Sequence, residues 1–359
     1  MKYIDEYRNK DIVQYFAGQI NIISTKHVRI MEVCGGHTVS IQKFGLPYLL
    51  PKTVELISGP GCPVCVTSRE YIDRAVAYSR MEDVIITTYG DLIRVPGSTS
   101  TLEKEKASGA DVRIVYSILD AMLIAKNNGL KKVIFLGIGF ETTAPASAAG
   151  ILKARTAGLK NFYVYSAHKV MPPAMEALID DGVNIDGYIG PGHVSTITGQ
   201  SIYMDIPKKY KMGVVISGFE PVDIMQSIHM LVQQIENNEP KVEIQYTRVV
   251  KPEGNVVAQQ MLDEIFEYRA DWWRGLGILK NSGLKIKKEY EMHDSEKMIE
   301  VEVEETIEPK GCICGLILRG EKKPKDCGLF GKSCTPADPV GACMVSSEGS
   351  CHASYLYNR

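Results

Sequence analysis

Short apolar runs alternate with amphipathic stretches over the first 240 residues of the chain. Apolar runs occur at 29–33, 53–57 and 83–89, and again at 112–116, 132–137, 162–166, 187–190 and 212–217. Stretches with helical spacing precede or separate many of them, at 5–17, 68–79, 117–127, 143–157, 172–180 and 223–237. Strands that alternate with helices are typical of parallel sheets covered by helices. The pattern therefore predicts an α/β fold with two parallel-sheet units in series.

The pattern changes after about residue 240, where charges become denser and the regular alternation ends. A strand at 247–250 and a helix at 255–267 are expected there, followed by two adjacent tryptophans. A stretch rich in lysine and glutamate at 285–310 leads into a tail that holds six of the nine cysteines. A chain of 359 residues is long enough for two or three domains. We expect α/β domains at 1–125 and 126–240, and a smaller third domain at 241–359 that carries the cysteine-rich tail.

The composition is that of a globular protein with no large charge excess. The hydrophobic share is 45% and the net charge is -2, so no basic surplus points to a nucleic-acid partner. The first ten residues are polar and do not resemble a signal peptide, and no apolar run approaches the roughly 20 residues that span a bilayer. These features predict a cytoplasmic protein without a membrane partner. In that compartment clustered cysteines more often bind metal or do redox chemistry than form stable disulfides.

Glycine-rich loops with reactive side chains follow most of the predicted strands. Ligands of open α/β sheets bind beyond the carboxyl ends of the strands, where these loops lie. A dinucleotide loop at 137–142 is disfavoured, because Thr142 stands where the fingerprint needs its third glycine. The loops read Cys-Gly-Gly-His-Thr at 34–38, Gly-Pro-Gly-Cys-Pro-Val-Cys at 59–65, Tyr-Gly-Asp at 89–91, Gly-Phe-Glu-Thr-Thr at 139–143, Gly-Pro-Gly-His-Val at 190–194 and Gly-Phe-Glu-Pro at 218–221.

Three cysteines lie in the amino-terminal loops. Cys62 and Cys65 have the two-residue spacing of redox dithiols and of half a zinc site, and no second pair nearby completes such a site. Cys34 and His37 bring a thiolate and an imidazole together, which suits a transition metal such as iron or a nucleophile with its base. Buried, inert cysteines are the alternative, but burial does not explain why all three lie in glycine-rich loops.

The tail cysteines predict an iron–sulfur cluster held by four thiolates. Zinc is the rival, although structural zinc favours paired spacings and only Cys312 and Cys314 are close in sequence. Two residues apart on an extended strand, these two would face opposite sides, so both are not expected to reach one cluster. Six thiols for four places leave a second spare elsewhere, and we assign the two spare places to Cys314 and Cys343, as an accessory redox or disulfide pair. The expected cluster ligands are Cys312, Cys327, Cys334 and Cys351.

Together with Cys-Met-Val-Ser-Ser-Glu-Gly-Ser-Cys at 343–351, these loops resemble the HypD family of hydrogenase maturation factors over nearly the whole chain. The motifs are specific in combination. The resemblance implies a scaffold and redox protein that helps to build the Fe(CN)2CO unit of nickel–iron hydrogenases, rather than a conventional turnover enzyme. It implies a small HypC-type partner that shares the transient iron, and a HypE-type protein that delivers cyanide. Alone, the protein is expected to be monomeric.

The resemblance also implies roles for single residues, carried over by matching motif. Cys34 would ligate the iron, with His37 beside it as a further metal-site residue. Cys62 and Cys65 would be the dithiol that exchanges electrons with a [4Fe-4S] cluster, in an arrangement similar to ferredoxin–thioredoxin reductase. The cluster ligands that the resemblance implies are again Cys312, Cys327, Cys334 and Cys351.

Three further residues are candidates near the iron. Asp91 is expected to take part in proton transfer, with an ordinary exposed loop residue as the alternative. Glu141 and His193 are expected to support the site from behind its ligands, and a structural histidine is the alternative for His193.

Two other functions compete with the maturation factor. One is a free-standing disulfide reductase of the ferredoxin–thioredoxin type, which has no need of the Cys34 and His37 pair. The other is a zinc-stabilised α/β binding protein without redox function.

Overall fold

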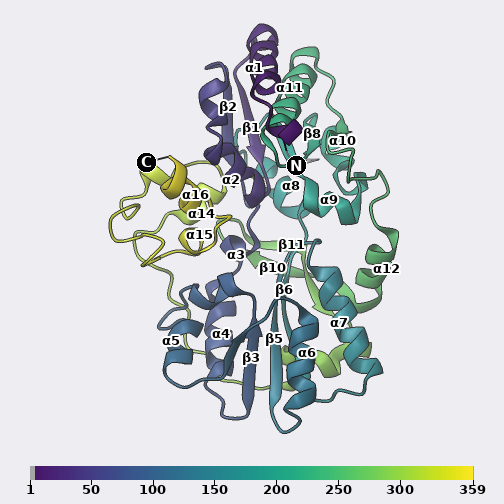
Figure 1. The fold of residues 1–359 in the computed structure, drawn as a ribbon, viewed down its shortest axis with the longest axis vertical. Helices are drawn as coiled ribbons and strands as arrows, with labels where there is room; N and C mark the ends of the chain where they lie inside the picture. Colours follow the sequence, from purple (N-terminus) through teal and green to yellow (C-terminus); the bar gives the residue numbers. More distant parts are fainter. Residues whose placement is uncertain (1–4, 359) are drawn as a thin grey trace.

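The computed structural model describes residues 5–358, which form two α/β lobes stacked along the long axis of the molecule (Figure 1). Every strand pairing in the two large sheets is parallel, as expected. The upper lobe holds a five-stranded sheet of order β2-β1-β7-β8-β9, with strands Val54–Ser58, Val28–Glu32, Gly187–Pro191, Gly213–Ser217 and Val242–Ile244. The lower lobe holds a four-stranded sheet of order β4-β3-β5-β6, with strands Val112–Ile114, Val84–Thr88, Lys132–Gly139 and Phe162–His168.

Helices cover both sheets and leave one end of each sheet free for loops. In the upper lobe α1 packs on α11, which in turn packs on β7 and β8. In the lower lobe α4 packs on β3, and α6 and α7 pack on β5 and β6. The main helices are α1 (Lys10–Ile23), α2 (Gly35–Lys43), α4 (Arg69–Ser79), α5 (Leu102–Ala107), α6 (Ile118–Asn127), α7 (Ala144–Thr156), α8 (Pro172–Asp180), α9 (Gly192–Thr198), α10 (Asp205–Tyr210), α11 (Pro221–Asn237) and α12 (Val256–Ile265).

The two sheets do not divide the chain at residue 125. The chain starts in the upper lobe, builds the lower sheet from β3 to β6, and returns to the upper lobe with β7. Strand β3 pairs with β5, with Val84 opposite Lys132, so strands from both sides of residue 125 share one sheet. Parallel strands need long crossovers whichever sheet they join, which is why the alternation alone cannot assign a strand to its sheet. The expected pair of successive α/β units is therefore an interleaved pair.

The segment after residue 240 differs from the expected small domain. Strand β9 extends the upper sheet, and the expected strand at 247–250 is absent from the described structure. The expected helix is α12, but its end passes directly into an antiparallel hairpin that the sequence analysis missed, β10 (Phe266–Trp273) and β11 (Gly277–Ile286). The hairpin packs against β6 and α8. Most of this segment therefore packs on the sheets of the two lobes, and the tail after residue 310 adds only short helices and loops to them.

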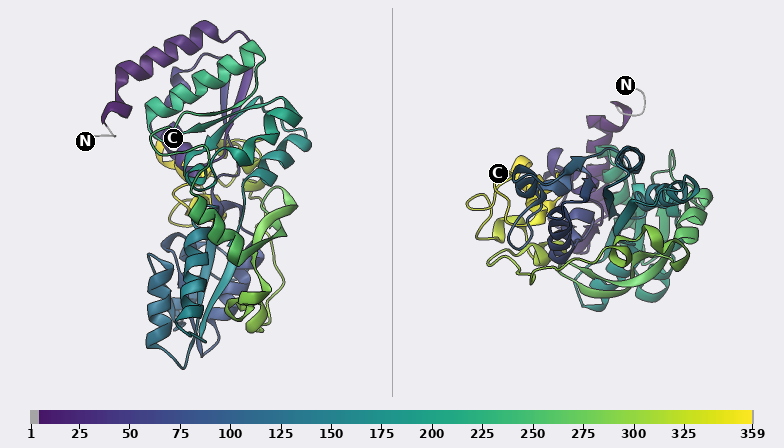
Figure 2. Two further views of the ribbon diagram at one scale, coloured as in Figure 1. Left: turned by 90° about the vertical axis from the view of Figure 1, so that its right-hand side faces the viewer. Right: turned by 90° about the horizontal axis from the view of Figure 1, so that it is seen from below.

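The cysteine-rich tail lies on one flank of the molecule, beside the junction of the lobes (Figures 1 and 2). Its short helices are α14 (Cys314–Leu318), α15 (Ala342–Val345) and α16 (Ser350–Tyr357), and α16 packs on α2. One continuous hydrophobic core contains Val33 of the upper lobe, Ile134 of the lower lobe and Met344 of the tail. The two lobes and the tail are therefore held together by shared apolar packing.

None of the helices in residues 5–358 combines the length and apolar character that crossing a bilayer requires.

Candidate functional site

The carboxyl ends of strands from both sheets meet around a cavity of about 380 Å³ at the junction of the lobes, here called the central cavity. Loops after β1, β2 and β7 reach it from the upper sheet, and loops after β3 and β5 reach it from the lower sheet. Two tail residues complete its wall. Its polar and reactive lining consists of Cys34, Tyr89, Asp91, Thr142, Thr143, His193, Ser346 and Glu348.

Cys34 is positioned by the turn between β1 and α2. It is the N-cap of α2, and its N–H donates to Oε2 of buried Glu32 at 3.1 Å. Gly61 allows the loop after β2 to pass close to the backbone of Cys34, because a Cβ at Gly61 would lie 2.5 Å from Cα of Cys34. Burial and the charge of Glu348 raise the pKa of the Cys34 thiol to about 12. The N–H groups at the start of α2 act in the opposite direction and lower this pKa. The thiol is therefore protonated at neutral pH until a cation displaces its proton.

His37 does not line the central cavity, in contrast to the expectation that it lies beside the iron. Its ring is fully buried, and Nε2 bonds to the carbonyl oxygen of Gly218 at 3.0 Å. Burial lowers the pKa of His37 to about 4, so the ring is neutral and donates from Nε2. Phe219 stacks on both His37 and His193, with ring centroids 4.6 and 3.9 Å apart. His193 is the imidazole that faces the cavity, and His37 stands behind it.

Two carboxylates of the central cavity lie close to each other. Asp91 lies in an exposed turn after β3 and accepts a hydrogen bond from Ser346 Oγ at 3.3 Å. Glu348 comes from the tail and was missed by the sequence analysis. Burial, and then the charge of Asp91, raise the pKa of Glu348. Both carboxylates line the central cavity together with Cys34.

Glu141, which was expected behind the metal site, points elsewhere. It is buried and lines a different cavity, while its neighbours Phe140 and Thr142 line the central one. The next residue along a loop often faces the opposite side, so a motif placed near a site does not place each of its side chains there.

Cys62 and Cys65 are joined by a disulfide, with Cα atoms 5.2 Å apart. Cys62 is the N-cap of the one-turn helix α3 (Pro63–Val66), and its Sγ accepts the N–H of Cys65 at 3.2 Å. Both side chains are buried, at 3% and 0% exposure. The dithiol therefore has little access to solvent.

All six tail cysteines line one narrow cavity, here called the thiol cavity. The expectation that Cys312 and Cys314 face opposite sides is wrong, because Cys312 follows a turn and Cys314 begins α14. Gly341 keeps the cavity open, since a Cβ there would lie 2.8 Å from Sγ of Cys312. Within residues 5–358 no three Cys, His, Asp or Glu side chains are grouped to hold a single metal ion. Geometry alone does not divide the six thiols into ligands and spares.

The dithiol and the thiol cavity lie in one neighbourhood, as expected from the motifs. Helix α15 packs on α3, and Cys62, Cys65 and Cys343 share one hydrophobic core. Arg274 joins the two regions. Its Nε donates to the carbonyl of Cys65 at 3.0 Å. The hydrogen bond with the Cys314 side chain, then burial and the charge of Cys314, raise the pKa of Cys312, and the charge of Arg274 opposes this rise.

Replacing Arg274 with methionine is expected to lower the free energy of unfolding by about 3 kcal/mol, because two buried carbonyls lose charged donors. These carbonyls belong to Cys65 and Thr67, each 3.0 Å from a guanidinium nitrogen. Urea unfolding measures the change. Arg80→Met removes an exposed ion pair with Glu105 and should cost about 1 kcal/mol or less. Equal stability of the two variants would contradict the bridging role.

Comparison with known proteins places these motifs in one family. The HypD model, described as the Hydrogenase formation hypA family, matches residues 11–358. The chain belongs to the HypD family of hydrogenase maturation factors. It is 44% identical over 369 residues to hydrogenase maturation factor HypD of Azotobacter vinelandii, covering 100% of this chain and 97% of that protein.

Other members of the HypD family are as similar. The chain is 43% identical over 370 residues to HypD of Cupriavidus necator, covering 100% of this chain and 98% of that protein. It is also 43% identical over 370 residues to HypD of Rhodobacter capsulatus, covering 99% of this chain and 98% of that protein. The resemblance that the motifs indicated is therefore confirmed over the full chain.

Proposed function

We propose that the protein is the scaffold on which the Fe(CN)2CO unit of nickel–iron hydrogenases is assembled, with the iron as its cargo. The observation that carries the proposal is the convergence of Cys34 with the loop that holds Cys62 and Cys65 at the junction of the lobes. Gly61 of this loop lies against Cys34, and Pro63 and Val64 line the central cavity with it. Cyanide and carbon monoxide stabilise low-spin ferrous iron, and a soft thiolate suits another face of that ion.

In this proposal Cys34 gives up its proton when it binds the iron. Asp91 and Glu348 are the acceptors at hand, since both line the central cavity with Cys34. His193 faces the same cavity. The ring of Phe219 stacks between His193 and the neutral His37, which holds the His193 ring in place. We therefore assign to His37 the role of positioning His193 through Phe219, from behind the wall of the cavity.

We propose the tail as the holder of a [4Fe-4S] cluster bound by Cys312, Cys327, Cys334 and Cys351, with Cys314 and Cys343 as an accessory pair. The donor set fits such a cluster, because six free thiols line one cavity. Gly341 has no side chain that would fill the space beside Cys312. Such a cluster would supply electrons to the Cys62 and Cys65 dithiol. Arg274 donates to the carbonyl of Cys65 and forms an ion pair with Glu308, just before the tail, so one side chain links the dithiol to the start of the tail.

A HypC-type partner would share the iron at the central cavity, and a HypE-type protein would bring cyanide to the same place. The position of Cys34 in the wall of the central cavity supports this, because a group of the partner that enters the cavity would meet its thiol. Mixing the protein with a HypC-type partner without oxygen should give a stable one-to-one complex on sizing. Two separate elution peaks at micromolar concentrations would count against the proposal.

Anaerobic purification followed by iron, sulfide and zinc analysis tests the cofactor directly. About four irons and four sulfides per chain, with a brown colour that reductant bleaches, are expected for a four-thiolate cluster. Infrared bands of cyanide and carbonyl ligands in the complex with the partner would report the cargo. A colourless preparation that contains zinc would overturn the proposal in favour of a zinc-stabilised binding protein.

Gly341→Ala is expected to lower the iron and sulfide content severalfold, because the added methyl group would press on Sγ of Cys312. Gly328→Ala is the matched control in the same tail, since nothing lies within 4 Å of a Cβ at that position. Equal iron content in the two variants would show that the thiol cavity does not hold the cluster.

A free-standing disulfide reductase is the alternative function. Its dithiol has to meet the disulfides of other proteins, whereas Cys62 and Cys65 are buried. This burial favours internal electron exchange.

A further inference from the structure

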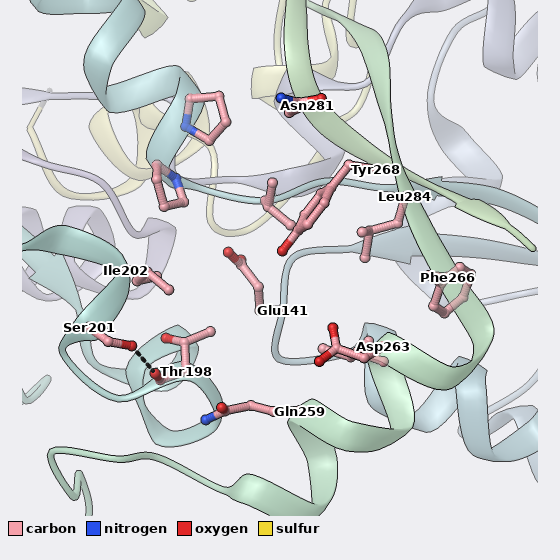
Figure 3. Close-up of a pocket in the computed structure, with 14 residues that line it drawn as sticks. Glu141, Thr198, Ser201, Ile202, Gln259, Asp263, Phe266, Tyr268, Asn281 and Leu284 are labelled. Carbon is pink, nitrogen blue, oxygen red and sulfur yellow. Dashed lines mark hydrogen bonds between the residues drawn. The ribbon is translucent and has the colours of Figure 1, made fainter. Parts of the chain in front are cut away.

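The loop after β5 forms a wall between two cavities. Phe140, Thr142 and Thr143 line the central cavity, whereas Glu141 lines a second cavity of about 430 Å³, here called the Glu141 cavity. Its walls come from both lobes: the ends of α8 and α9, helix α12, and the hairpin β10–β11 (Figure 3). Neither the thiols nor Asp91 reach it.

Glu141 is the chemical centre of this cavity. Its side chain is 4% exposed, and Oε1 accepts the N–H of Met171 at 3.0 Å. Oε2 is buried and has no hydrogen-bond partner in the described part of the chain. Figure 3 shows the carboxyl group of Glu141 in the middle of the space that the lining residues surround, with the hydroxyl group of Tyr268 directed toward the same space. A buried acceptor without a donor is costly, and a ligand that brings a donor removes that cost.

The other lining residues define which donor fits. No lysine, arginine or histidine is among the described residues that line the cavity, so an anion would find no counter-charge. Asp263 adds a second carboxylate, and Tyr268 contributes a hydroxyl. Much of the remaining wall is apolar, including Leu262 and Phe266. We propose that the Glu141 cavity binds a small organic cation, an ammonium or amidinium group on an apolar body, with Glu141 as its counter-ion.

Burial raises the pKa of Glu141 to about 7, so the carboxyl group is only partly ionised at neutral pH without a cation beside it. A cation beside the carboxylate reverses such a rise, because it stabilises the ionised form. The assignment stands beside the maturation function and does not depend on it.

The protein carries its own reporter for binding. Its two tryptophans are adjacent, at 272 and 273, and the Trp273 ring stacks on Phe140 with centroids 5.8 Å apart. Phe140 precedes Glu141 in the loop. Occupation of the Glu141 cavity should therefore change the intrinsic fluorescence.

Titration with benzamidinium, benzamide and benzoate tests the charge requirement, because the three probes share size and shape. Benzamidinium should bind saturably below about 10 mM, and benzamide at least about tenfold more weakly. Benzoate should not bind. Saturable binding of benzoate, equal binding of benzamide, or no saturable binding of benzamidinium would overturn the proposal.

Glu141→Gln keeps the size of the side chain and an acceptor for Met171, but removes the charge. It should weaken benzamidinium binding at least about tenfold. Glu82→Gln makes the same change at an exposed position outside the cavity and should leave binding unaltered. Melting curves establish that each variant is folded. Should Glu141→Gln not fold, Asp263→Asn, at an exposed position, should weaken binding severalfold. Undiminished binding in the folded variants would exclude this site.

Discussion

Replacing Cys34 with alanine is expected to abolish hydrogenase maturation without unfolding the protein. In the proposed function its thiolate is the protein's own ligand to the iron, and no other thiol lines the central cavity in the described residues. The change removes one half-buried sulfur atom at the N-cap of α2, so the fold should persist. Hydrogenase activity in cells that carry only the variant should fall at least about 100-fold, as expected when a metal site loses its ligand.

Two measurements separate loss of the ligand from damage to the protein. The tail should keep its full iron and sulfide content, while the complex with the HypC-type partner should lose its cargo iron. Ser40→Ala, on the same helix and outside the central cavity, should mature hydrogenase normally. Full maturation by the Cys34 variant would exclude Cys34 as the iron ligand.

Local pattern predicted the elements of this fold better than their assembly. The expected helix at 172–180 coincides with α8, because Pro172 and Pro173 fix its start. The hairpin β10–β11 was missed because charged and small residues hide its alternation, with Glu267 and Lys285 paired across exposed strands. The interleaving of the two sheets could not be predicted, since register between remote strands depends on packing that no local pattern records.

The same limit applies to the candidate site. The motifs correctly placed Cys34, Asp91 and His193 around one cavity, because all follow strands whose carboxyl ends converge. They could not show that His37 turns inward along α2. Nor could they show that Glu348, 314 positions after Cys34, lines the same cavity from the tail. The tertiary fold decides which way each side chain of a loop points and which remote segments come into contact.

Cys62 and Cys65 are expected to be as important for maturation as Cys34, but for a redox reason. Replacing both with alanine removes the disulfide and leaves the central cavity and the thiol cavity in place. If this dithiol passes electrons to the assembling iron unit, maturation should fall at least about 100-fold, as after loss of a metal ligand. Hydrogenase activity in cells that carry only the double variant measures the effect.

Stability must be separated from redox function in this experiment. A disulfide that closes so short a loop stabilises the fold by only about 2 kcal/mol in the chain-entropy account. Val66→Ala is the matched control, because it truncates a buried side chain in the same helix at a cost of about 2 kcal/mol and keeps both thiols. Urea unfolding should give similar stabilities for the two variants, and only the Val66 variant should mature hydrogenase. Normal maturation by the double variant would mean that the electrons take another route.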